Sequence, residues 1–396
     1  MADANELLQQ ARTYLEQGEL SNAEQTYREV LKADPRSAEA LAELGRFAMA
    51  REKIDEGLRL VEQALDVDPK FAQALAYKGL AYSMKEDFER ATPLFEEAVK
   101  QDPAMTMAWH NLARAYRKLG HWEKAEKAVR EAINLDPKHF QSHYELSTIL
   151  ANTGRTTEAI RAALLSIEIN PYFIKGYMTL GKAYELGGKG DLALRLYHEG
   201  LKHIPSAVIL REEVIRLSLM KRDMKTAYVE MAILTKQNNN YDNNMRLGNL
   251  AILAGDFEGA EKAFKRAAQI RPDMGDPHFN LGEIYQSAKL KDEAIAEYEK
   301  AIALDANEWK AYNSLGVLFM KDETPESLKK AAGYFQETLA RNTRAPEPYY
   351  NLALIYGKSG SKAEAKKYAQ MALERIPTDG VLKQDVERLI RALTEH

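Results

Sequence analysis

The sequence predicts an all-α fold, a right-handed α-solenoid of antiparallel helix pairs closed by a C-terminal capping helix. Three observations predict it: prolines at a constant interval, apolar residues at helical spacing between them, and a composition rich in Ala, Leu, Glu and Lys in which no strand pattern competes. The prolines that lie 34 residues apart are Pro35, Pro69, Pro103, Pro137, Pro171 and Pro205. An array of this kind grows along one axis, so we expect one elongated body.

The clearest copy of the repeated unit contains two amphipathic segments, at 107–119 and 122–135, with a turn through Gly120. The residues that place an apolar stripe on the first segment are Trp109, Leu112 and Tyr116. Neither segment can bury its stripe alone. Each must therefore pack on its partner and on the next pair, as the repeats of a solenoid do.

The unit resembles the tetratricopeptide repeat, because it reads W-x2-L-[GA]-x2-Y, then A-x3-[FYV]-x2-A and a closing proline. Eleven units are expected to begin near Ala4, Ala38, Ala72, Thr106, Phe140, Ile174, Val208, Tyr241, Gly275, Trp309 and Pro346. After Pro205, closing prolines return at Pro272 and Pro377. The resemblance implies a superhelix whose concave groove, lined by the first helix of each unit, holds proteins or peptides.

The expected organisation has four parts. Residues 4–207 form an N-terminal array of six repeats, 208–240 a degenerate repeat, 241–379 a C-terminal array of four repeats, and 380–396 the capping helix. The apolar residues on one face of that last helix are Leu382, Val386, Leu389, Ile390 and Leu393.

Two units depart from the pattern. The seventh lacks its closing proline and ends in Asn238, Asn239 and Asn240. This segment is either a joint between two arrays or a solvated polar turn within one continuous solenoid, and the sequence leaves both open. The tenth unit carries three extra residues within 321–329, which we expect to lengthen the turn between its helices.

Composition excludes several functional classes. A net charge of -4, from 59 acidic and 55 basic residues, provides no general attraction to nucleic acid or anionic membranes. The absence of cysteine excludes disulfides, thiolate metal sites and a cysteine nucleophile. No apolar stretch reaches about eighteen residues, and the N-terminal ten residues lack the basic and apolar regions of a signal peptide. We therefore expect a cytoplasmic protein without direct membrane insertion.

Motifs for catalysis fail on inspection. The stretch 176–183 matches G-x4-G-K, but Ala183 stands where a phosphate-binding loop needs Ser or Thr, and no strand precedes it. His139 and His143 have the spacing of two metal ligands, but no third ligand converges on them by sequence. We expect no enzyme activity, no cofactor and no metal.

The repeat register places a basic and aromatic set on the inner face of units four to six. Its members are His110, Asn111, Arg114, Arg117, Tyr144, Thr148, Lys175, Met178 and Lys182. Positive charges between Tyr and Met suit an acidic peptide or the acidic face of a partner helix. The alternative is a solvated groove that holds no ligand there.

A second candidate lies in units eight to ten. Some tetratricopeptide adaptors bind a C-terminal carboxylate through a clamp of Lys, Asn, Asn, Lys and Arg, and by register this chain has Asn249, Asn280 and Lys310 at three of those places. Met245 and Ser314 replace the other Lys and the Arg, which weakens the match. Tyr350, in the last unit, is a further expected anchor.

These observations predict a non-catalytic interaction scaffold or adaptor that binds partner proteins or extended peptides, acidic ones in particular. The alternative is a regulatory or substrate-recruiting subunit of an enzyme complex. A carboxylate-clamp co-chaperone is less favoured, nucleic acid is not expected, and homo-oligomerisation remains open.

Overall fold

The computed structural model describes residues 3–305, 307–376 and 380–394, and within these ranges the chain forms 23 α-helices and no strand. The all-α prediction is therefore confirmed. Pro377, the last of the expected closing prolines, lies outside the described residues, as do 395 and 396 at the end of the expected capping helix.

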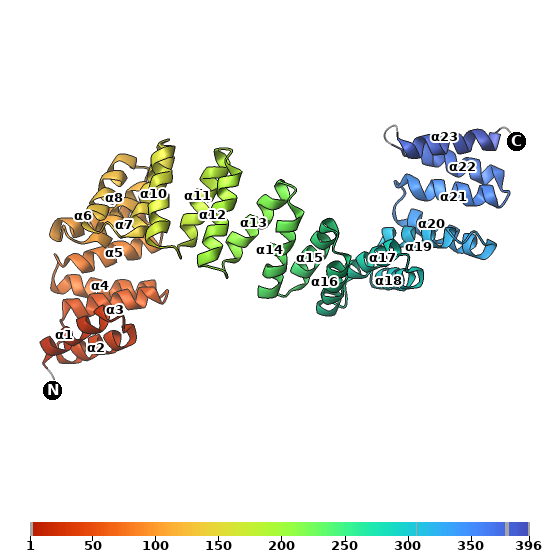
Figure 1. Cartoon of the computed structure of the whole chain (residues 1–396). Coiled ribbons are helices and arrows are strands. Elements are labelled where there is room, and N and C mark those ends of the chain that lie inside the picture. Colours follow the sequence, from red (N-terminus) through yellow and green to blue (C-terminus); the bar gives the residue numbers. More distant parts are fainter. Residues whose placement is uncertain (1–2, 306, 377–379, 395–396) are drawn as a thin grey trace. The chain divides into compact units, whose positions relative to one another are not determined.

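The helices form consecutive pairs, and neighbouring helices contact each other from α1 to α12 and from α14 to α23 (Figure 1). The first helices of the pairs are α1 (Ala4–Glu16), α3 (Ala38–Ala50), α5 (Ala72–Met84), α7 (Thr106–Lys118), α9 (Phe140–Asn152), α11 (Ile174–Leu186), α13 (Val208–Met220), α15 (Tyr241–Ala254), α17 (Asp276–Ser287), α19 (Trp309–Met320) and α21 (Pro346–Lys358). Their starts agree with the predicted unit starts to within one residue.

Apart from α12 and α14, whose neighbour α13 is considered below, the second helices pack against the first helix of their own pair and against the helix that follows. They are α2 (Leu20–Ala33), α4 (Ile54–Val67), α6 (Phe88–Gln101), α8 (Trp122–Leu135), α10 (Thr156–Ile169), α12 (Gly190–His203), α14 (Met224–Gln237), α16 (Phe257–Ile270), α18 (Lys291–Leu304), α20 (Pro325–Arg341) and α22 (Lys362–Leu373). Small residues let the paired backbones approach closely, as Ala113 and Ala125 do in the fourth pair, where both are fully buried.

The turn inside each pair contains one residue in the left-handed backbone region. Glycine occupies this position at Gly18, Gly120, Gly154, Gly188, Gly255 and Gly360. Non-glycine residues occupy it at Glu52, Glu86, Arg222, Lys289 and Glu323. The turn geometry is thus kept throughout the array, even where the side chain opposes it.

The chain divides by its internal contacts into two units, residues 1–210 and 211–396. The division falls within α13, the first helix of the seventh repeat, which is the repeat that lacks its closing proline. Whether that segment acts as a joint stays a hypothesis.

The three extra residues of the tenth unit lengthen the second helix, so the expectation that they lie in the turn is wrong, although the turn at 321–324 is one residue longer than that at 288–290. α20 has 17 residues, whereas α18 of the preceding unit has 14. Thr324 caps α20 through a hydrogen bond from Ser327 N to its Oγ1 (3.2 Å), and Pro325 follows at the first helical position. Because a proline there is preorganised for helix and needs no N–H partner, the inserted residues join the helix.

A last helix, α23 (Val381–Thr394), packs against α22 and α21. Val386 is fully buried in a cluster that also contains Leu382, Leu389 and Ile390. The apolar face predicted for the capping helix therefore covers the core at the end of the array.

Candidate partner-binding surface

Each first helix divides its side chains between the core and one open face. In α7, Leu112 and Tyr116 are buried, whereas Arg114 is exposed and Asn111 half-buried. The first helices of successive repeats also contact one another, as α3, α5, α7 and α9 do. We call the surface formed by their outward side chains the first-helix face.

A small apolar pocket of 110 Å³ lies on this face between α5 and α7. Its lining residues are Gln73, Ala76, Tyr77, Leu80, Met105, Met107 and Asn111. Met107 is 48% exposed although it is apolar. Asn111, predicted as a groove residue, therefore lies beside a place that could accept a small apolar side chain.

Three of the predicted cations are available to a ligand. Arg114, Lys175 and Lys182 are exposed, and within the described part of the chain none of them forms an ion pair. They belong to α7 and α11, which are the first helices of the fourth and sixth repeats. The intervening helix α9 supplies Tyr144, so cations flank an aromatic side chain in repeat order.

Arg117 differs, because its guanidinium forms an ion pair with the Glu145 carboxylate of the next repeat. The side chains are 19% and 5% exposed, so this pair is largely withdrawn from solvent. The repeat register did not predict Glu145 as the partner of Arg117.

His110 lies in a polar cluster and not as a free ligand on the face. Its Nδ1 is 3.3 Å from Ser142 Oγ, which is itself 2.7 Å from His139 Nδ1. Burial lowers the pKa of His110 to about 4, and His139, Arg114 and Arg117 add repulsion in the same direction. His110 is therefore neutral at pH 7.

The pair His139 and His143 has other partners. His143 Nε2 donates to the carbonyl oxygen of Pro137 at 2.9 Å, which leaves that nitrogen no lone pair for a metal. Among the residues that the structure describes, no group of three His, Asp or Glu side chains could hold an ion.

Tyr144 links α9 to α11. Its ring lies 5.1 Å from that of Phe173, edge on, and its hydroxyl accepts a hydrogen bond of 3.4 Å from Thr179 Oγ1. Met178 of α11 is half-buried. Tyr144 is therefore held in place before any ligand arrives, as a binding anchor should be.

The clamp-like residues of repeats eight to ten differ in exposure and in hydrogen bonding. Asn249 and Lys310 are exposed, but Asn280 donates from Nδ2 to the carbonyl oxygen of Asp276 in its own helix at 3.0 Å. Burial raises the pKa of the Glu283 carboxyl above its ordinary value, and the nearby charge of Lys310 opposes this shift. A carboxylate beside Lys310 reduces the attraction of this site for a second carboxylate.

Tyr350 packs in the apolar cluster formed with α23. Burial raises the pKa of its hydroxyl, and the charge of Asp385 on α23 adds to the shift. The capping helix α23 thus covers part of Tyr350, which the sequence predicts to be a binding anchor.

Family models of the tetratricopeptide repeat match residues 14–80, 84–144 and 251–316, and further residues at 140–173 and 346–379. Together the matches cover more than half of the chain. The chain belongs to the tetratricopeptide repeat family.

Curated relatives share parts of this tetratricopeptide array. The type IV pilus assembly protein PilF of Pseudomonas aeruginosa is 28% identical over 133 residues, which are 33% of this chain and 52% of PilF. The human protein O-mannosyl-transferase TMTC2 is 27% identical over 138 residues, 31% of this chain and 16% of the transferase. The chain thus spans about half of the first relative and a small part of the second.

Solved structures with the same repeats include PilF, with 18% identity and a TM-score of 0.45 over 53% of this chain and 95% of PilF. Another is YrrB, described as a tetratricopeptide protein with an unusual peptide-binding site, with 18% identity and a TM-score of 0.38 over 50% of this chain and 97% of YrrB.

No helix among the described residues of this tetratricopeptide array is both long enough and apolar enough to cross a membrane.

Proposed function

We propose that this chain is a non-catalytic interaction scaffold that holds acidic, extended segments of partner proteins on the first-helix face of repeats three to six. The observation that carries the proposal is the set of exposed, unpaired cations Arg114, Lys175 and Lys182, on the first helices before and after the one that carries Tyr144. Cations without a carboxylate partner attract acidic ligands.

Two neighbouring features support an extended peptide as the ligand. The pocket beside Asn111 accepts a small apolar side chain, and the Asn111 amide offers a donor and an acceptor to a peptide backbone. Arg117 is not expected to bind the acidic segment directly, because Glu145 already neutralises its charge.

The test is affinity capture from native lysate with the wild type and with the double variant Arg114→Glu/Lys182→Glu. We expect the variant to lose its acidic partners, and the wild type to lose them as salt is raised. The matched control is Lys127→Glu/Arg195→Glu, which makes the same change in charge on exposed positions of the second helices α8 and α12.

An unchanged partner set in the groove variant would contradict the proposed surface. Recovery of one catalytic subunit whose turnover depends on this chain would instead support the regulatory or substrate-recruiting role. Equal losses in the groove variant and in its control would show that net charge, and not the first-helix face, governs capture.

A further inference from the structure

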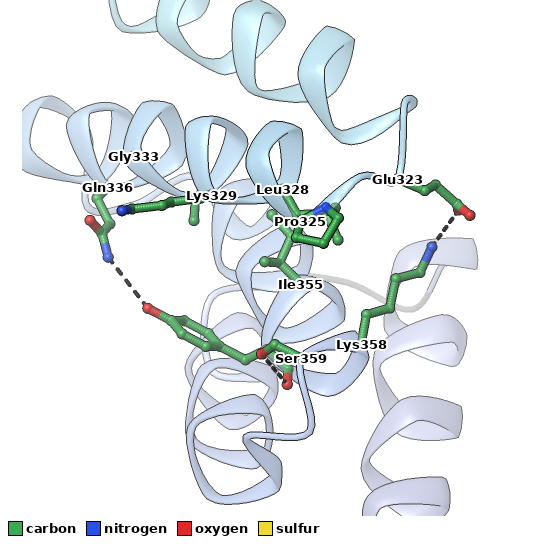
Figure 2. Close-up of a pocket in the computed structure, with 11 residues that line it drawn as sticks. Glu323, Pro325, Leu328, Lys329, Gly333, Gln336, Ile355, Lys358 and Ser359 are labelled. Carbon is green, nitrogen blue, oxygen red and sulfur yellow. Dashed lines mark hydrogen bonds and ion pairs between the residues drawn. The ribbon is translucent and has the colours of Figure 1, made fainter.

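A second pocket lies in the C-terminal unit, on the tenth and eleventh repeats. It measures 760 Å³ and is bounded by Glu323, by α20 as far as Gln336, and by the C-terminal end of α21 with the residue after it (Figure 2). This volume falls in the range of sites that hold a ligand. One wall includes Pro325 and Leu328, which belong to the helical turn that the insertion added to α20.

The middle of the pocket is apolar and its two ends are polar. Pro325, Leu328 and Ile355 lie between the ends (Figure 2). At one end Glu323 and Lys358 form an ion pair, so their charges cancel. Lys329 lies at the other end, near Gln336, and within the described residues it forms neither a hydrogen bond nor an ion pair.

The end at Lys329 has the groups that bind a carboxylate. Gln336 Nε2 donates to the hydroxyl oxygen of Tyr356 at 3.4 Å, which leaves the O–H proton of Tyr356 free to donate. An ammonium and a phenol at one end of an apolar pocket match a negative oxygen group attached to an apolar body.

Gly333 has no role in the core that would explain it. It lies within α20, where glycine costs helix stability, yet a Cβ atom at this position would meet nothing within 4 Å. By contrast, a Cβ at Gly316 of the same repeat would lie 2.6 Å from the ring of Phe335. The equivalent positions of neighbouring repeats carry Lys262, Ala296 and Lys367. The missing side chain at Gly333 therefore leaves the pocket open and does not serve close packing of the helices.

We propose that this pocket binds a segment of a partner polypeptide in which a bulky apolar side chain is adjacent to a carboxylate. The apolar side chain lies among Pro325, Leu328 and Ile355, and the carboxylate lies at Lys329 and Tyr356. A polypeptide segment fits because the pocket is a surface site between two helices, where one or two side chains enter while the backbone stays outside. This site is independent of the function proposed above.

The first experiment selects phage-displayed random peptides on the intact chain alone. We expect the selected peptides to include a group that shares a bulky apolar residue beside Asp or Glu. Selection of no peptide, or of peptides without an acidic residue, would overturn the proposal.

The second experiment measures the affinity of a selected peptide, labelled with fluorescein, by anisotropy. We expect Lys329→Ala to weaken binding about tenfold at low salt, as the loss of a charge-assisted contact does, and Gly333→Gln to weaken it at least as much. Lys330→Ala is the matched control, because Lys330 neighbours Lys329 on α20 but lies outside the pocket lining.

Folding is checked by thermal unfolding followed by circular dichroism. Gly333→Gln should unfold at a higher temperature than the wild type, because glutamine favours helix over glycine. Weaker binding by a more stable variant cannot be due to misfolding. Equal affinity of Gly333→Gln and the wild type would place the peptide elsewhere and would refute the site.

Discussion

At the scale of single residues, glycines in the middle of the first helices determine how closely the two helices of a pair approach. A Cβ at Gly282 would lie 2.6 Å from the Cδ1 and Cε1 atoms of the Tyr298 ring. Tyr298 is fully buried, so its ring cannot move aside without disturbing the core. The glycine is therefore needed for packing and not for backbone conformation.

We predict that Gly282→Ala destabilises the chain by about 1–3 kcal/mol, the usual cost of overpacking a core. Gly333→Ala is the matched control, since a Cβ there meets open space and alanine should stabilise the helix by about 1 kcal/mol or less. Urea unfolding of both variants checks the opposite signs. A Gly282→Ala variant as stable as the wild type would show that the aromatic ring adapts.

His110 makes stability depend on pH. Its pKa is about 4 in the folded chain, against an ordinary value of 6.5, so between these pH values the unfolded chain binds a proton that the folded chain does not. The contribution of His110 to stability is therefore complete above pH 6.5 and declines as the pH falls toward 4.

We predict that His110→Gln is less sensitive than the wild type to acid between these values. The measurement is the difference between the urea midpoints of the two proteins at several pH values from 7 to 4. Comparing them cancels the carboxylates, which both proteins retain, while the repulsion between His110 and His139 is part of the measured difference. A constant difference across this range would contradict the low pKa of His110.

At the scale of helices and turns, the left-handed residue in each turn has a predictable cost. Lys289 adopts a φ of 62° between α17 and α18, whereas the preceding repeat uses Gly255 at the equivalent place. We predict that Lys289→Gly stabilises the chain by roughly 0.5–1 kcal/mol, because the strain of a side chain at positive φ is relieved. Gly255→Ala should destabilise it by a similar amount, and thermal unfolding compares the two.

The positions of the helices can be predicted from the sequence, whereas the length of α20 was not. Amphipathic spacing and the regular prolines are local signals, so they located the helix starts to within one residue. The expectation that the three extra residues lie in the turn overlooks Thr324 and Pro325, which begin α20. A helix-start signal of this kind can be read from sequence.

At the scale of the whole molecule, the joint expected at 208–240 can be tested by small-angle scattering. If the segment is a joint, the profile of the intact chain should require an ensemble, while the two flanking parts, 4–207 and 241–396, each fit one conformation. A single rigid conformation that fits the intact chain would contradict the joint and favour a continuous solenoid.

The sequence by itself determined the class of fold, the repeat number and the family. Each repeat is one helix pair that can bury its apolar stripe only against its neighbours, and such a pattern depends on periodicity alone.

Tertiary structure decided which of the candidate groups are free to bind. Arg117 meets Glu145 of the next repeat, and α23 partly covers Tyr350. The pocket at Gly333 exists only because α20 and α21 lie beside it. Side-chain partners and cavities depend on distances across neighbouring repeats, and those distances follow from helix packing rather than from the spacing of residues along the chain.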